Sequence, residues 1–240
     1  MKSIKMKYWL LVVVLSFSSC SDFLEEDTRG KQMQESFYNT DNEIEGGLMG
    51  IYGRIINTDA GIRGNLIYRN EACSDLLTYK PVAAATGMAF PKYMLTPENE
   101  LIKTTWDHLY STIFGINAYI QAIENNMSPK VSEKVKDVCL KEAKFFRALM
   151  YYHLIMCWGD VPLRTEPTNM SDTDIERTPK DKVVEVILSD LSEAVTLPEK
   201  ASVKKGRISK GAALYLLAKV HLMQGDMKSA CLLYTSPSPR

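Results

Sequence analysis

A chain of 240 residues, 45% hydrophobic and 24% charged, is long enough to bury a substantial core and has the composition of a globular protein. Its 29 basic residues balance its 29 acidic residues, and no dense cluster of lysine and arginine occurs along it. Such a chain offers no positive field to attract a polyanion, so we exclude nucleic-acid binding.

The first 19 residues have the pattern of a bacterial signal peptide. Three lysines precede the apolar run 8–15, which is too short to span a bilayer as a stable helix. Two serines stand directly before Cys20, as small residues do in the lipobox of bacterial lipoproteins, although Phe17 differs from the leucine usual there. We expect residues 1–19 to be removed and Cys20 to carry a lipid. Ordinary cleavage beside an incidental cysteine is the alternative.

Residues 20–39 form a polar stretch that begins with an acidic run, Asp22 to Asp27. The simplest interpretation is a solvated tether between the lipid and a folded domain. An acidic run directly after a lipidated cysteine is also similar to the surface-export signal of lipoproteins of Bacteroidota. We therefore favour a protein that is exposed at the cell surface.

The helical part of the chain, residues 40–234, opens with a capping box. Thr40 is expected to accept from the Glu43 amide while the Glu43 side chain reaches back to the Thr40 amide. The apolar stripe of this helix consists of Ile44, Leu48, Ile51 and Ile55. Four glycines between Gly46 and Gly53 lie in the same helix, and each destabilises it by up to about 1 kcal/mol relative to alanine. Close packing against a neighbouring helix would offset that loss.

A long loop is expected from Tyr79 to Pro97, where Pro, Gly and Ala runs replace any periodic pattern. Loops of this length in compact domains are usually functional or mobile. The loop carries three aromatic residues, Tyr79, Phe90 and Tyr93. They could stack on a ligand or simply cover the surface of the domain.

Two long helices follow this loop. Thr96 and Pro97 supply a cap and a first-turn proline for a helix that extends to Asn125, and Ser128 with Pro129 begins the next. Because the connection between them is short, we expect an antiparallel pair.

The second of these helices contains the stretch around which we expect the rest of the chain to pack, Glu142 to Leu163. Apolar side chains cover most of its circumference, so the helix must be packed on several sides. Gly159 can adopt the positive φ that ends a helix, and Pro162 cannot continue one.

Further helices and one basic loop follow. Residues 178–181 are expected to cap a helix that ends near Leu197, with Thr178 and Pro179 at its start. The loop 201–209 contains Arg207 and two lysines. We expect a solvated turn there, because the Gly-x-x-x-x-Gly-Lys cradle of phosphate sites is absent.

The run from Gly211 to Ala230 has the small residues and the Gly-Asp turn typical of a tetratricopeptide-like helical hairpin. Gly159 and Gly225, each followed by aspartate, lie 66 residues apart, close to two periods of the roughly 34-residue repeat. We predict an all-α fold, an array of antiparallel helical hairpins with tetratricopeptide-like units and long loops between them. Residues 235–240 are expected to be an unstructured or foreign tail, because they stop a helix that has only begun.

No catalytic constellation is recognisable. The three histidines, His108, His153 and His221, fall on different predicted helices, and neither a His-Glu-x-x-His nor a Gly-x-Ser-x-Gly motif is present. We therefore expect no metal site, no cofactor and no enzymatic activity, and binding is the favoured class of function.

Four cysteines follow Cys20, and no two of them form a Cys-x-x-Cys pair. Buried free thiols are therefore expected in preference to a disulfide framework or a metal site. These cysteines are Cys73, Cys139, Cys157 and Cys231.

Several motifs carry a resemblance to a known family. The main ones are Glu142-Ala143, Phe145, Arg147-Ala148 and the run Trp158-Gly-Asp-Val-Pro-Leu163, followed by Thr178-Pro179, Asp190-Leu191 and Gly206-Arg207. They resemble landmarks of the SusD/RagB family of outer-membrane nutrient-uptake lipoproteins of Bacteroidota, with Lys144, Phe146 and Trp158 as departures. The resemblance extends from residue 20 to about residue 233, and family members are about twice as long. It therefore implies a SusD-like N-terminal helical domain over residues 40–234, with the C-terminal half of the family absent.

The resemblance also implies a function. Family members are lipid-anchored at the outer membrane, capture glycan or sometimes peptide, and deliver it to a partner TonB-dependent transporter of the SusC type. Variable loops supply much of the ligand platform, so Tyr79, and with it Tyr93, is the candidate for stacking on a sugar. The alternative is a tetratricopeptide-like envelope scaffold that binds only protein partners.

Overall fold

The computed structural model describes residues 38–56, 94, 96–126, 128–168 and 175–234. The elements in these residues are α3 (Asp41–Ile56), α6 (Glu100–Glu124), α7 (Glu133–Trp158), α8 (Lys180–Ala194), the 3-10 helix η3 (Lys200–Ser202), α9 (Lys210–Met223) and α10 (Met227–Tyr234). The β structure of the described ranges is one isolated antiparallel bridge, between Val161 and Thr178. The prediction of an all-α fold is confirmed. Within the same ranges, no helix is both long and apolar enough to cross a membrane.

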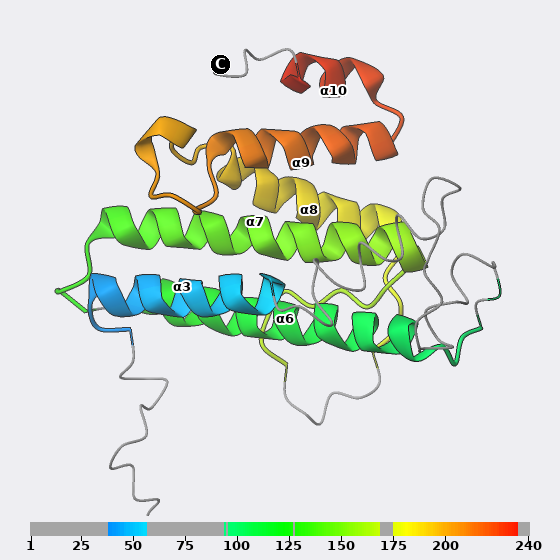
Figure 1. Ribbon diagram of the computed structural model, residues 1–240, viewed down its shortest axis with the longest axis horizontal. Helices are drawn as coiled ribbons and strands as arrows, with labels where there is room; N and C mark the ends of the chain where they lie inside the picture. Colours follow the sequence, from blue (N-terminus) through cyan, green and yellow to red (C-terminus); the bar gives the residue numbers. More distant parts are fainter. Residues whose placement is uncertain (1–37, 57–93, 95, 127, 169–174, 235–240) are drawn as a thin grey trace, which may run out of the picture. The chain divides into compact units, whose positions relative to one another are not determined.

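Helix α7 is the element against which the others pack. It contacts α3, α6, α8 and α9, and α10 packs on α9. Figure 1 shows α3 and α6 on one side of α7 and α8 and α9 on the other, with α6 and α7 running in opposite directions. Residues with no exposed surface, such as Met150, Tyr151 and Leu154, fill the middle of α7. The expectation that this helix is packed on several sides is confirmed there, but it is wrong for the last turn, where Met156 and Cys157 are exposed.

Helix α3 begins where the capping box predicts. The Glu43 amide donates to Thr40 Oγ1 at 3.4 Å, but Glu43 Oε2 accepts from the Asn39 amide at 2.9 Å and not from the Thr40 amide. The predicted apolar stripe of α3 is buried along its whole length. Its N-terminal residue also fixes the start of α7, since Asp41 accepts from both the amide and the hydroxyl of Ser132, at 2.7 and 2.8 Å.

Close packing explains one glycine of α3. A Cβ at Gly47 would lie 2.5 Å from Cε1 of Tyr38 and 3.0 Å from Cε2 of Tyr119, so a side chain there would force these rings to move. At Gly46, Gly50 and Gly53 a Cβ would meet none of the described atoms within 4 Å. Close packing therefore accounts for the glycine at one of the four positions, Gly47.

Two predicted helix starts are wrong, by three and four residues. Helix α6 begins after Asn99, whose Oδ1 accepts from the Leu101 amide at 3.0 Å, and not at Thr96 and Pro97. Helix α7 begins after Ser132, whose Oγ accepts from the Val135 amide at 3.4 Å, and not at Ser128. In both cases a later capping side chain is available, and the proline falls in a turn before it.

The α9–α10 hairpin has the predicted tetratricopeptide-like form. Gly225, with φ of +79°, makes the turn between the two helices, and Asp226 accepts from the Ser229 amide at 3.0 Å to cap α10. Buried Ala218 and Ala230 allow the close approach of the helices that the small residues predict.

Candidate functional site

The corner after α7 connects α7 to α8. Gly159, with φ of +70°, ends α7 as predicted, and Asp160 Oδ1 then accepts from the Lys180 amide at 2.8 Å. Val161 and Thr178 exchange two backbone hydrogen bonds, of 3.2 and 3.0 Å. The cap of α8 is therefore a side chain 20 residues upstream of Lys180. The expected capping by Thr178 is wrong, since the first turn of α8 has no cap from its own flanking residues.

A buried ion pair lies under this corner. Arg147 on α7 donates to both carboxylate oxygens of Asp190 on α8, at 2.8 and 2.7 Å, and the two side chains are 10% and 5% exposed. The remaining guanidinium nitrogen donates to Asn117 Oδ1 at 3.1 Å and to the Thr165 carbonyl at 3.2 Å. Burial raises the pKa of Asp190, and the hydrogen bond and charge of Arg147 oppose that rise. Because both charges are paired with good geometry, the cluster locks α6, α7 and α8 together.

The same cluster holds the extended chain that leaves the corner. The Tyr151 hydroxyl donates to the Arg164 carbonyl and accepts from the Arg164 amide, both at 2.7 Å. Asn117 Nδ2 donates to the Arg164 carbonyl at 3.0 Å. We call Arg147, Asp190, Asn117 and Tyr151 the corner clasp. It sets the backbone of residues 164–165 from three helices at once.

Three aromatic rings cover the outside of the corner. Trp106 lies 4.8 Å from Tyr110 and 5.2 Å from Trp158, between ring centroids, and each ring is partly exposed. The Tyr110 hydroxyl donates to the Pro162 carbonyl at 2.8 Å. Since the polar end of Tyr110 is engaged, the cluster presents apolar ring surface beside a fixed backbone.

A second buried ion pair joins α3, α7 and the loop before α9. Arg207 contacts both oxygens of Glu142 at 2.8–3.0 Å, and the side chains are 9% and 1% exposed. Tyr52 donates to Glu142 at 2.5 Å and accepts from the Ile208 amide at 2.7 Å. Burial is the main cause of a raised pKa at Tyr52, and Glu142 adds to it. The expectation of a solvated basic turn is therefore wrong for Arg207, because its side chain compensates the buried carboxylate.

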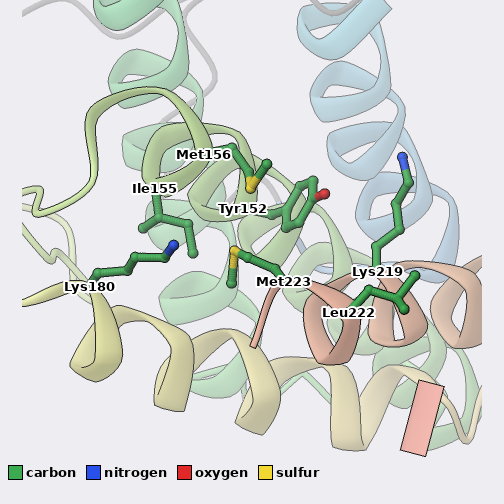
Figure 2. A pocket seen from close by; sticks show the side chains of 7 residues that line it. All are labelled: Tyr152, Ile155, Met156, Lys180, Lys219, Leu222 and Met223. Carbon is green, nitrogen blue, oxygen red and sulfur yellow. The ribbon is translucent and has the colours of Figure 1, made fainter. Parts of the chain in front are cut away.

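An open groove lies at the C-terminal end of α7, between α8 and α9 (Figure 2). Its volume is about 540 Å³, within the range of pockets that hold small ligands. We call it the α7–α9 groove, and it is lined by Tyr152, Ile155, Met156, Lys180, Lys219, Leu222 and Met223.

The three histidines do not come together. His108, His153 and His221 lie on α6, α7 and α9. Nδ1 of His221 lies 3.3 Å from Asp226. Across the described part of the chain, no three histidine, cysteine or acidic side chains are placed to hold a metal ion.

The cysteines differ from expectation. Cys139 is buried, as predicted, but Cys157 and Cys231 are exposed, on the last turn of α7 and on α10. The prediction is wrong for these two because the outer faces of both turns have no helix packed over them in the described ranges. Cys73 lies outside the described residues.

The candidate ligand and anchor residues also lie outside the described residues: Cys20, Tyr79, Phe90 and Tyr93. The signal peptide, the tether and the tail 235–240 do so as well, apart from the last two tether residues. Sequence reasoning missed the corner clasp. One available signal was the presence of Arg147 and Asp190 on apolar helix faces, where a buried charge needs a partner.

The comparisons with known proteins agree on the family. A SusD-like family model described as "Starch-binding associating with outer membrane" matches residues 22–222. A SusD-like protein of Formosa agariphila is 30% identical over an alignment of 257 positions, which covers 98% of this chain and 47% of the relative. One of Bacteroides ovatus is 30% identical over 223 residues, which cover 90% of this chain and 39% of the relative. The chain thus spans less than half the length of these curated relatives.

Solved structures share the fold. One described as a laminarin-binding SusD-like protein has a TM-score of 0.71 and 27% identity, over 82% of this chain and 43% of that chain. A SusD superfamily protein of Bacteroides vulgatus has a TM-score of 0.74 at 18% identity, over the same shares of the two chains, and shows the fold alone. With the family model, the relatives and the helical array in agreement, the chain belongs to the SusD-like family.

Proposed function

We propose that this protein binds glycan at the outer membrane and delivers it to a TonB-dependent transporter of the SusC type. The observation that carries the proposal is the family match over residues 22–222, whose description names starch binding and the outer membrane. The fold shared with a laminarin-binding protein at 27% identity supports the same class of ligand. Because this chain spans less than half of its relatives, the proposal concerns the complete protein.

A lipid on Cys20 would hold the protein at the membrane, with residues 1–19 removed and the acidic stretch as a tether and surface-export signal. The test is membrane fractionation of host cells. Cys20→Ala should move the protein from the outer-membrane fraction to the soluble fraction. Cys157→Ala, which removes an exposed cysteine on α7, should leave it in place. Retention of the Cys20→Ala protein in the membrane would contradict the lipid anchor.

The glycan is proposed to stack on Tyr79, with Tyr93 as a second contact. An exposed aromatic ring offers a sugar face apolar contact at low entropic cost. The rest of the platform is proposed to lie in the part of the relatives that this chain does not span. The proposed role is binding without catalysis, in line with the family description, which names starch binding.

The first experiment is calorimetry of the complete protein with laminari- and malto-oligosaccharides. We expect binding of at least one of them. Tyr79→Ala should weaken that binding by about tenfold, which corresponds to about 1.4 kcal/mol. The matched control is Tyr215→Ala, which removes a tyrosine that is 57% exposed on α9. Equal affinities of the two variants would show that Tyr79 does not contact the glycan. An absence of binding to any glycan would overturn the proposed class of ligand.

A scaffold that binds only protein is the second candidate. It is favoured by the exposed apolar residues of the α9–α10 hairpin, where Met227 and Leu232 are 60% and 68% exposed. Affinity purification of the tagged, lipidated protein from its host separates the two. A stoichiometric TonB-dependent transporter supports uptake, whereas soluble envelope proteins without a transporter support the scaffold.

A further inference from the structure

The α7–α9 groove has an apolar floor and a basic edge. Ile155, on the floor, is 2% exposed, while Met156 and Leu222 at the sides are 52% and 48% exposed. Figure 2 shows Lys180 reaching from α8 toward Ile155 and Lys219 rising from α9 on the other side of the groove. The surface is therefore concave, with flexible methionine and leucine side chains that can adapt to an inserted apolar group.

The polar groups of the groove are all able to donate hydrogen bonds. They are the ammonium groups of Lys180 and Lys219 and the Tyr152 hydroxyl, and the lining contains no carboxylate or carboxamide. Within the described part of the chain neither ammonium is paired with a carboxylate, and Lys219 lies over the Tyr215 ring at 5.1 Å from its centroid. The nearby Asp160 is engaged by the backbone amide of Lys180. A complementary ligand must therefore bring the acceptors and the negative charge.

Charge and shape together select among ligand classes. A sugar would need several acceptors and donors close to its hydroxyls, and the groove offers two ammonium groups and one hydroxyl over an otherwise apolar surface. A flat anionic membrane would reach the lysines but not Ile155 on the recessed floor. A peptide can place apolar side chains on the floor and carboxylates at the edges at the same time.

We propose that the α7–α9 groove is a docking site for a segment of a partner protein in which apolar side chains are flanked by aspartate or glutamate. The apolar side chains lie on Ile155 and Met223, between Met156 and Leu222. The flanking carboxylates pair with Lys180 and Lys219.

The test uses the complete protein and a fluorescein-labelled peptide, acetyl-Glu-Glu-Phe-Leu-Glu-Glu-amide, in anisotropy titrations. A second peptide carries lysine in place of each glutamate. The protein variant is Lys180→Glu with Lys219→Glu. Helix α8 tolerates the first change because a glutamate in a first turn interacts favourably with the helix dipole. The matched control is Lys200→Glu with Lys205→Glu, which makes the same change in charge at two exposed lysines outside the groove.

We expect the acidic peptide to bind and the basic peptide to bind at least tenfold more weakly. The groove variant should lose about tenfold in affinity for the acidic peptide, since two exposed pairs are replaced by like charges, and the control should stay within twofold. Leu222→Ser, which removes one wall without a change of charge, should also weaken binding. Equal affinities of the groove variant and the control would overturn the proposal. So would an absence of binding, or binding of anionic phosphatidylglycerol vesicles in place of the peptide.

Discussion

The α6–α7 hairpin and the α9–α10 hairpin have the same plan, two antiparallel helices joined by a short turn, but they bury different amounts of apolar surface. In α7, Met150 and Leu154 have no exposed surface. In the second hairpin Leu222, Met227 and Leu232 are 48%, 60% and 68% exposed. Helix α7 packs against four other helices, whereas the main neighbour of α10 is α9. The comparison shows that similar apolar patterns are buried according to how many helices surround them.

The two hairpins also differ in how deeply their ion pairs are buried. Arg147 with Asp190 and Arg207 with Glu142 both include a residue of α7. The pair of His221 and Asp226, at the turn between α9 and α10, is 21% and 44% exposed. Charges are therefore desolvated where helices enclose them on several sides, and there they need complete pairing. Four predictions, in order of decreasing effect, test how far enclosure by neighbouring helices determines stability.

The largest effect is expected at the corner clasp. Arg147→Ala leaves the Asp190 carboxylate buried without its partner, so the free energy of unfolding should fall by about 3–5 kcal/mol. Urea unfolding measures the loss. Lys204→Ala is the control, because it breaks the pair of Lys204 with Glu45 in which the lysine is 71% exposed, and it should cost no more than about 1 kcal/mol. Equal midpoints for the two variants would contradict the role of the clasp.

A leucine substitution in each hairpin compares their packing directly. Leu154→Ala opens a cavity in the core beside α7 and should destabilise the protein by about 2–5 kcal/mol. Leu222→Ala removes an exposed side chain on α9 and should change stability by no more than about 0.5 kcal/mol. Thermal or urea unfolding of the pair gives both values. A larger loss at Leu222 would mean that the second hairpin is more enclosed than the described residues indicate.

The capping of α8 is expected to have an intermediate effect. Asp160→Ala removes the acceptor for the Lys180 amide and should cost about 0.5–2 kcal/mol. Asp160→Asn keeps a carbonyl oxygen in the same place and should recover much of that loss. Thr178→Val keeps the backbone bridge to Val161 and should be nearly neutral. If the Thr178 variant destabilised the protein and the Asp160 variants did not, Thr178 would be the cap of α8, as predicted from the sequence.

The smallest effect is a pH dependence at α6. Burial lowers the pKa of His108 below its ordinary value, and the charge of Arg54 acts in the same direction. The folded protein therefore binds fewer protons here than the unfolded chain. Stability present above the ordinary histidine pKa of about 6.5 is lost as the pH falls through the folded value.

Substitution of the histidine tests this linkage. His108→Gln should flatten the decrease in urea midpoint between about pH 7 and about pH 5. Arg54→Gln should flatten it to a lesser degree, because Arg54 is the second cause of the lowered pKa. Identical pH profiles for the wild-type and His108→Gln proteins would exclude a contribution from this residue.

Much of the helical array could be predicted because its signals are local. The stripe from Ile44 to Ile55 and the breaks at Gly159 and Gly225 are read from neighbouring residues, and the structure has them in place. The helix starts were less predictable. Ser128 and Ser132 offer similar local caps, and the contact of Ser132 with Asp41, 91 residues away, distinguishes them.

Long-range pairing also explains what was missed around the candidate sites. Arg207 looks like part of a basic turn until α7 brings Glu142, 65 residues away, beside it. The α7–α9 groove combines Lys180 and Lys219 from two helices with the end of a third, and neither lysine stands out in the sequence. Tyr79 and Tyr93 were proposed from composition and family resemblance, and they remain predictions.

The bridge between Val161 and Thr178 has a consequence for how such sequences can diverge. The bridge holds Val161 and Thr178 together, between the end of α7 and the start of α8, and the corner clasp contacts the backbone of residues 164–165. Residues inserted between Thr168 and Ile175 would therefore leave the corner intact. Each doubling of such a loop adds only about 0.6 kcal/mol of closure entropy. This is a position at which natural variants can acquire new surface chemistry while the helices that carry it stay the same.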